Sequence, residues 1–129
     1  MSTTISAISI DTADAAALAA FWAGVLGRPV NPGATADYAA IDAADPAGDP
    51  SADPTGGPKV TFHKVPELTT ARNRVRLGLR TDRYEAESQR LVDLGAEALG
   101  AYEKPSLRWT TFADPEGNEF DLVTVRPTE

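Results

Sequence analysis

The chain contains the same pattern twice. Over residues 8–27, an alternating strand is followed by a polar cap and an amphipathic helix that ends at Leu26-Gly27. Over residues 75–95 the same order ends at Leu94-Gly95, so the two glycines are 68 positions apart (27 to 95). A repeat of this size in 129 residues predicts two half-domains of one design. We expect a ligand site where the two halves face each other.

Length and composition define the broad class of the chain. One compact domain over residues 1–129 is expected at this length, and 42% hydrophobic residues suffice for a core. A net charge of −7 argues against nucleic acid and against an anionic membrane as partners. The absence of cysteine excludes disulfides and fits a reducing compartment. The sequence has no signal-peptide pattern and no membrane-length apolar run, so we expect a cytoplasmic protein.

The first half, about residues 5–65, is predicted as one β-α-β-β-β module. A strand over 5–11 precedes the helix, which either Thr12 or Asp14 can cap, and Gly27 and Pro29 end it. Further strands are predicted over 28–30, 37–41 and 59–65. The apolar positions of the helix recur at helical spacing and predict its buried side: Leu18, Phe21, Trp22, Val25 and Leu26.

The second half, about residues 73–125, follows a linker over about 66–72 and repeats the order of elements. Asp82 and Glu85 have the spacing of a capping box at the start of its helix. The predicted buried side of that helix consists of Tyr84, Leu91 and Leu94. Strands are predicted over 96–102 and 107–113, and a last strand carries Phe120, Leu122 and Val125 after the turn at 114–118.

An acidic segment separates two strands of the first half. Residues 42–58 contain four aspartates among prolines and glycines. Their spacing is not that of an EF-hand and no glutamate closes the loop, so a mobile acidic loop is the interpretation favoured over a calcium site.

The opening IDTADAAALAAFWAGVLG and the closing WTTFADPEGNEFDLV resemble the vicinal oxygen chelate superfamily, in particular its glyoxalase-like branch near the bleomycin-resistance type of protein. The resemblance covers about residues 5–125. It implies an α+β fold in which two β-α-β-β-β modules form curved mixed sheets around a cleft. Because many members are homodimers, it also implies a homodimer.

Enzymes of this superfamily hold a divalent metal through His, Glu or Gln at equivalent strand positions of the two modules. The resemblance assigns three of these positions to Ala7, Arg76 and Asp121. The fourth position falls near His63. Alanine has no donor atom, and a guanidinium has no lone pair and repels a cation. The two remaining ligands are fewer than the three of typical catalytic zinc sites. The sequence therefore predicts no metal and no cofactor.

The charged residues of the lost metal site have two interpretations. Because the family topology makes their strands neighbours, Arg76 is expected to pair with Glu119 or Asp121. The guanidinium then either binds a carboxylate or phosphate of a ligand, or is neutralised by the two acids in a structural cluster.

Two further residues complete the predicted ligand site. His63, the single histidine, can act as a general base or make one hydrogen bond at the rim of the cleft. Trp109 either presents a flat face to an aromatic or cationic ligand or packs in the core. Tyr38 and Tyr102 are weaker candidates of the same kind.

The predicted function is metal-independent binding of a small organic molecule, such as the sequestration of a drug or secondary metabolite. The predicted ligand-binding residues are His63, Arg76, Trp109, Glu119 and Asp121. The alternative is a lyase, isomerase or dioxygenase with a non-standard metal site built from His63, Glu119 and Asp121. A third interpretation is a structural or regulatory protein with a vestigial cleft. The acidic balance favours a cationic guest and the arginines an anionic one, so the charge of the guest stays open.

Overall fold

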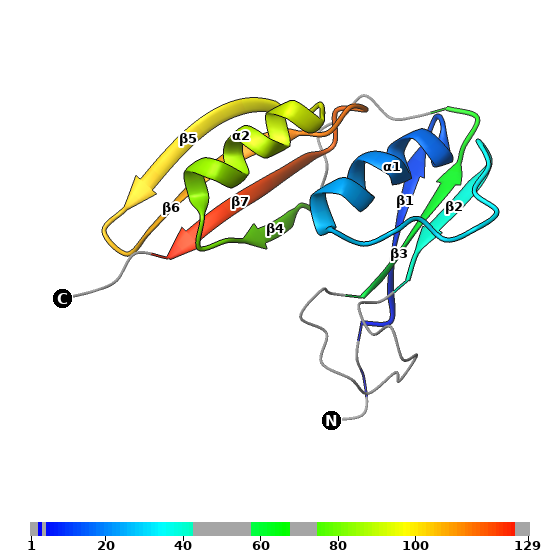
Figure 1. Cartoon of the computed structure of the whole chain (residues 1–129), viewed down its shortest axis with the longest axis horizontal. Coiled ribbons are helices and arrows are strands. Elements are labelled where there is room, and N and C mark those ends of the chain that lie inside the picture. Colours follow the sequence, from blue (N-terminus) through cyan, green and yellow to red (C-terminus); the bar gives the residue numbers. More distant parts are fainter. Residues whose placement is uncertain (1–2, 4, 43–57, 68–74, 126–129) are drawn as a thin grey trace. The chain divides into compact units, whose positions relative to one another are not determined.

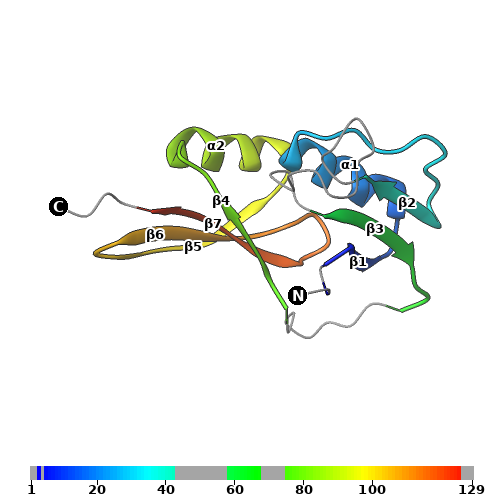
Figure 2. The ribbon, with the colours of Figure 1, turned by 90° about the horizontal axis from the view of Figure 1, so that it is seen from below.

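The computed structural model describes residue 3 and residues 5–42, 58–67 and 75–125. The chain divides into two compact units, Met1–Thr69 and Thr70–Glu129. Each unit contains one mixed sheet with one helix on one of its faces (Figure 1, Figure 2). The α+β class and the two modules of β-α-β-β-β type are confirmed. The second module shows every strand of that pattern, and the described part of the first shows β-α-β-β.

The first unit is a three-stranded sheet in the order β1-β3-β2. Strands β1 and β3 are parallel, and β2 and β3 are antiparallel. The elements are β1 (Ala7–Thr12), α1 (Ala15–Leu26), β2 (Tyr38–Ile41) and β3 (Lys59–Lys64).

Helix α1 begins and ends as the sequence predicts. The Asp14 side chain caps it by accepting a hydrogen bond from the backbone nitrogen of Ala17 at 3.2 Å. Gly27 ends it in the left-handed region at φ 68°. The strand predicted over 28–30 is wrong. Those residues are irregular, because the left-handed turn redirects the chain and Pro29 has no N–H for a sheet hydrogen bond.

The core of the first unit lies between α1 and its sheet. The predicted helix stripe is buried except for Leu26, which is half-buried. Phe62 is fully buried on β3, where it pairs with Ile10 of β1. Alternate residues of β1 and β3 therefore face the helix, and the residues between them form a polar face.

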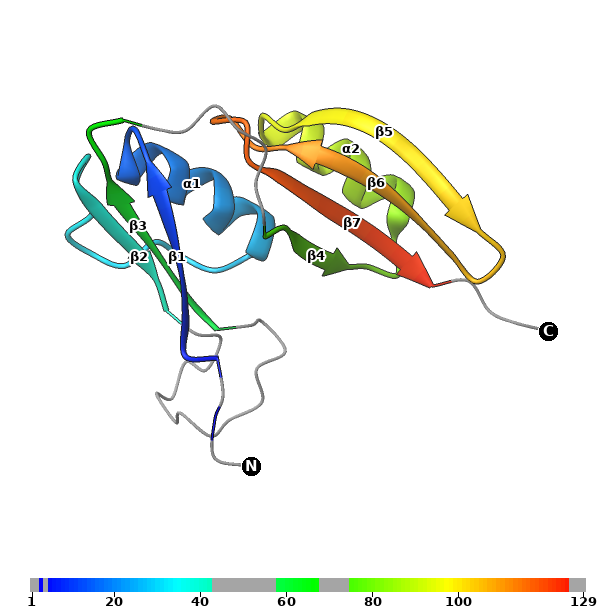
Figure 3. The same cartoon turned by 180° about the vertical axis from the view of Figure 1, so that it is seen from behind.

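The second unit is a four-stranded sheet in the order β4-β7-β6-β5. Strands β4 and β7 are parallel, and the other pairs are antiparallel (Figure 3). The elements are β4 (Leu77–Arg80), α2 (Tyr84–Leu94), β5 (Glu97–Lys104), β6 (Leu107–Ala113) and β7 (Glu119–Val125).

Helix α2 differs from the prediction at its start and along its buried side. It begins after Arg83, and no side chain caps this described N-terminus, so the capping box at Asp82 and Glu85 is wrong. The Thr81 hydroxyl instead accepts a hydrogen bond from the backbone nitrogen of Arg83, which takes the place of the box. Only Leu91 is buried, because the helix covers just part of its sheet. Tyr84 is half-buried, with its hydroxyl bonded to that of Thr110, and Leu94 is exposed.

The turn predicted at 114–118 is confirmed and sets the register of the last two strands. The buried Asp114 carboxylate accepts hydrogen bonds from the backbone nitrogens of Glu116 and Asn118, both at 2.9 Å. Gly117 takes the positive φ of 90° that the turn requires. The turn joins β6 to β7 so that Thr111 lies directly opposite Asp121.

Two remaining expectations concern the acidic segment and membrane association. Most of the acidic segment predicted over 42–58 lies outside the described residues. Within the described ranges, neither helix has the length and apolar character needed to cross a bilayer.

Candidate functional site

The polar face of the second sheet carries an ion-paired cluster at its β4 side. The guanidinium of Arg76, just before β4, lies 2.9 Å from Asp121 Oδ2 and 3.4 Å from Glu119 Oε1. The Thr111 hydroxyl donates to Asp121 Oδ1 at 2.6 Å. All three charged side chains are less than a third exposed, at 29%, 23% and 18% for Arg76, Glu119 and Asp121. The pairing of Arg76 with both acids is therefore as predicted.

In these contacts the charged groups of the cluster are paired with one another. Both carboxylate oxygens of Asp121 are hydrogen-bonded, one to the guanidinium and one to the Thr111 hydroxyl. The two carboxylates together carry more negative charge than the single positive charge of Arg76 can neutralise. The geometry therefore favours the structural interpretation of Arg76 over an arginine that awaits an anionic ligand.

An aromatic pair, Trp109 and Tyr102, lies on the same face of the sheet, two residues from Thr111 along β6. Trp109 precedes Thr111 by two residues, so both side chains point to the same side of the sheet. Its ring stacks on that of Tyr102 with centroids 5.4 Å apart and an interplanar angle of 27°. The ammonium of Lys104 stands 5.9 Å from the Trp109 ring centroid. Trp109 thus belongs to the polar face and not to the core under α2.

Gly100 allows the phenol of Tyr102 to approach the ionic cluster. A Cβ atom at residue 100 would lie 2.7 Å from the Tyr102 hydroxyl, so this hydroxyl stands directly over Gly100. Gly100 is in turn the cross-strand partner of Thr111. The aromatic pair and the ionic cluster therefore form one continuous surface. Sequence reasoning missed Thr111 and Gly100, although the two-residue spacing from Trp109 to Thr111 was a signal for the first.

The polar face of the first sheet holds a chain of hydrogen bonds between two hydroxyl groups and an imidazole. The Ser9 and Thr61 hydroxyl oxygens are 2.9 Å apart, and Thr61 Oγ1 is 3.1 Å from His63 Nε2. The ring of Tyr38 contacts the imidazole edge-on at a centroid distance of 5.0 Å. Thr61 is buried, whereas His63 is exposed.

The strand register identifies which residue of β3 corresponds to Asp121. Gly78, two residues after Arg76, pairs with Asp121. In the first module the residue two positions after Ala7 is Ser9, and it pairs with Thr61. Thr61 is thus the repeat equivalent of Asp121, and His63 lies two residues beyond it.

The residues at the four equivalent positions do not fit a divalent metal. Ala7 supplies no donor, Thr61 supplies only a neutral hydroxyl, and Arg76 supplies a positive charge. Asp121 has both carboxylate oxygens engaged. Among the residues that the structure describes, no three His, Cys, Asp or Glu side chains lie close enough to hold an ion together.

The structure gathers four of the five predicted ligand-binding residues on one surface. Arg76, Glu119, Asp121 and Trp109 share the polar face of the second sheet. His63 lies in the first unit, where its described partners are Thr61 and Tyr38.

Paired modules of a mixed sheet and one helix, with a polar strand face opposite the helix, define a glyoxalase-like fold. The chain belongs to the glyoxalase-like domain family, which matches residues 7–123. No curated protein matches it by sequence.

Solved structures at low identity share the fold. An enzyme of the glyoxalase/bleomycin resistance protein/dioxygenase family from Burkholderia phytofirmans has a TM-score of 0.75 at 18% identity, over 96% of this chain and 100% of that one. A fosfomycin resistance protein from Mesorhizobium loti has a TM-score of 0.69 at 14% identity, over 96% and 93%. A mutant of such a protein from Listeria monocytogenes, solved with Mn(II) and dihydroxypropylphosphonic acid, has a TM-score of 0.70 at 14% identity, over 95% and 90%.

Proposed function

We propose that the chain binds a small organic molecule on the polar face of the second sheet, without a metal ion at the superfamily positions. The observation that carries this proposal is the position of Arg76. Its guanidinium is paired with Glu119 and Asp121, so the protein itself supplies a permanent positive charge to these carboxylates. A metal would have to compete with this charge for the Asp121 carboxylate.

The same surface has the groups that a flat polar guest needs. Trp109 and Tyr102 supply an aromatic platform, and Tyr102 is 52% exposed. The ionic cluster beside them supplies hydrogen-bonding groups that are fixed by one another rather than by the guest. Such pre-organisation lowers the entropic cost of binding. We therefore propose a guest with a planar ring and at least one polar substituent.

We further propose that the protein holds this guest and does not convert it, as a cytoplasmic sequestration protein for a drug or secondary metabolite. Asp11 lies beside His63 in the strand register, but no carboxylate is among the described hydrogen-bond partners of His63, which are a hydroxyl and, by ring contact, a phenol. The fold is shared with proteins named for fosfomycin resistance, which supports a role in resistance.

The test combines metal analysis with a fluorescence titration. Metal content of the gently purified protein is measured by mass spectrometry, and we expect substoichiometric Zn, Mn, Fe and Ni. The Trp22→Phe variant leaves Trp109 as the only tryptophan, because the chain has two. A panel of planar aromatic acids, amines and alcohols is then titrated, and a guest should change the emission of Trp109 and raise the melting temperature.

Matched variants decide where a guest binds. Trp109→Phe retains Trp22, which is buried in the first unit and should not respond. Gly100→Ala forces the Tyr102 phenol away from residue 100 and should weaken binding without touching Arg76. Stoichiometric metal, or a panel without any saturable response, would contradict the proposed function.

A further inference from the structure

Strand β5 forms an open edge of the second sheet. In the order β4-β7-β6-β5, no described strand pairs with its outer side (Figure 1, Figure 3). All of its residues except Gly100 are exposed. They include two large apolar side chains, Leu99 at 46% and Tyr102 at 52%. An exposed strand edge with apolar side chains readily pairs with another strand.

A bulge gives this edge an unusual symmetry. The eight residues of β5 lie opposite the seven of β6, because one extra residue, Leu99, is inserted between Ala98 and Gly100. Counted by their β6 partners, Ala101 is the midpoint of β5, since it pairs with Thr110, the middle residue of β6. Residues at equal distances on either side of Ala101 therefore point to the same face of the sheet.

That symmetry makes the edge complementary to itself. Two antiparallel copies of β5 related by a two-fold axis through Ala101 would place Glu97 of each copy opposite Lys104 of the other. Gly100 would lie opposite Tyr102, whereas Leu99, the extra residue of the bulge, has no counterpart. Without the bulge, Glu97 and Lys104 would be seven residues apart and would point to opposite faces, so they would not meet.

We propose that β5 pairs with β5 of a second copy of this chain, so that two four-stranded sheets join into one. The pairing brings together opposite charges at both ends of the strand and places Tyr102 of each copy opposite Gly100 of the other. The small side chain of Ala101 at the axis permits close approach. The pairing does not require the proposed small-molecule function, because it needs no guest, although Tyr102 belongs both to this strand and to the aromatic platform.

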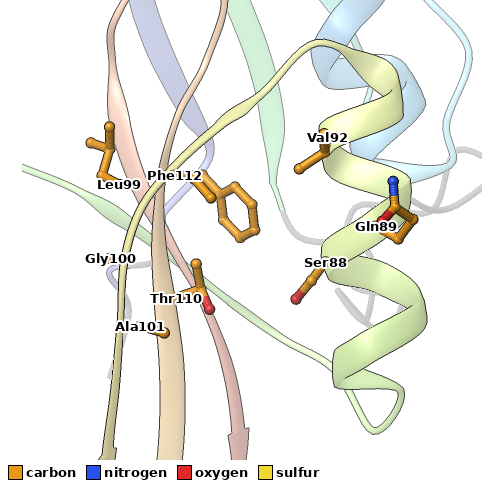
Figure 4. A pocket seen from close by; sticks show the side chains of 9 residues that line it. Ser88, Gln89, Val92, Leu99, Gly100, Ala101, Thr110 and Phe112 are labelled. Carbon is orange, nitrogen blue, oxygen red and sulfur yellow. The ribbon is translucent and has the colours of Figure 1, made fainter.

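A groove beside the edge fits this interpretation. It has a volume of about 400 Å³ and runs between α2 and β5 (Figure 4). Val92 of α2 lines it and is 45% exposed, and Leu99 and Ala101 of β5 border it. In the paired state the β5 side of this groove would be bounded by the second copy, which removes apolar surface from water.

Charge reversal tests the register. Glu97→Lys places lysines opposite each other in both symmetric positions, and Lys104→Glu does the same with glutamates. Each should raise the dimer dissociation constant by about tenfold, because both copies of the charge pair become repulsive. The double variant Glu97→Lys/Lys104→Glu should restore the wild-type constant. Sedimentation velocity over a concentration series measures all of these, and the constants should weaken with added salt.

Mixing the two single variants provides the sharpest result. Glu97→Lys chains and Lys104→Glu chains repel their own kind but attract each other, so the mixture should form a heterodimer tighter than either homodimer. Glu67→Lys and Lys64→Glu, at exposed positions in the first unit, change net charge equally and should leave the constant unchanged. A wild-type chain that stays monomeric at its highest soluble concentration would overturn the proposal. A dimer that tolerates both single reversals, or that forms only with a different protein, would overturn it as well.

Discussion

The two modules use the same sheet face for different chemistry. In the first, Ser9, Thr61 and His63 form a chain of hydrogen bonds without an ion pair among these three residues. In the second, the equivalent strands carry the Arg76–Asp121 ion pair. Both modules keep a strand pair with the same parallel register, so the backbone was conserved between the repeats while the side chains on this face diverged.

The positions equivalent to superfamily metal ligands carry different groups in the two modules. In the first module, Ala7 and Thr61 supply no charge. In the second, the positive side chain of Arg76 is paired with Asp121 and Glu119. The aromatic pair of Trp109 and Tyr102 lies on the same sheet face as this ion pair.

The apolar faces should behave alike, and their disruption should have the largest effect. Phe62 in the first module and Phe120 in the second are both fully buried. Replacing either with alanine should lower the free energy of unfolding by about 3–5 kcal/mol. Urea titrations followed by Trp22 emission in a Trp109→Phe background, and by Trp109 emission in a Trp22→Phe background, measure each module. A loss below about 1 kcal/mol in one module would show that its core is not formed as described.

The polar faces should differ in their response to substitution. Arg76→Met leaves two partly buried carboxylates without their cation, and should lower the free energy of unfolding by about 1–2 kcal/mol, between exposed and buried ion pairs. Ala7→Met at the equivalent exposed position of the first module should change it by less than about 0.5 kcal/mol. Equal effects at the two positions would remove the contrast between the modules.

The hydroxyl of Thr61 in the hydrogen-bond chain of the first module should contribute less, and its contribution should not depend on salt. Thr61→Val keeps the shape of a buried side chain but removes the hydroxyl shared by Ser9 and His63, and should cost about 0.5–1.5 kcal/mol. Added salt should leave this loss unchanged while it reduces the loss in Arg76→Met. A loss at Thr61 that depends on salt as strongly as the loss in Arg76→Met would contradict this contrast.

The smallest expected effect lies on the outer surface of α2. The Arg90 guanidinium lowers the pKa of Glu87 by a direct hydrogen bond at 2.8 Å. This pair stabilises the fold when Glu87 is ionised, so its contribution is present at neutral pH and disappears as the pH falls below about 4.5 and through the lowered pKa. Glu87→Gln should lose only a few tenths of a kcal/mol at pH 7, because the pair is partly exposed. The difference from wild type should vanish in acid, and a difference that grows there would contradict this assignment.

Sequence reasoning succeeded where local chemistry decides. Asp14 and Gly27 bound α1 because a capping carboxylate and a left-handed glycine act within one helical turn. The turn around Asp114 formed for the same reason. The predicted strand at 28–30 and the capping box at Asp82 failed, because tertiary contacts and the preceding turn override weak local preferences there.

The site was predictable in its charges but not in its continuity. The alternation of β7 and the family topology sufficed to expect that Arg76 pairs with Glu119 or Asp121. The face of Trp109 stayed open in the sequence, since a strand with residues buried on both sides hides its alternation. The register of β5 against β6, with its bulge, determined that Gly100, Thr111 and Tyr102 join the aromatic and ionic parts.

The sequence by itself determined the duplicated α+β scaffold and the absence of metal-donor atoms at Ala7 and Arg76, because helix periods, caps and donor chemistry are properties of residues and their spacing. Only the tertiary structure decided that Thr61 is the counterpart of Asp121 and that a bulge at Leu99 shifts the register of β5 against β6. Both depend on strand register, which is fixed by hydrogen bonds between segments distant in the chain.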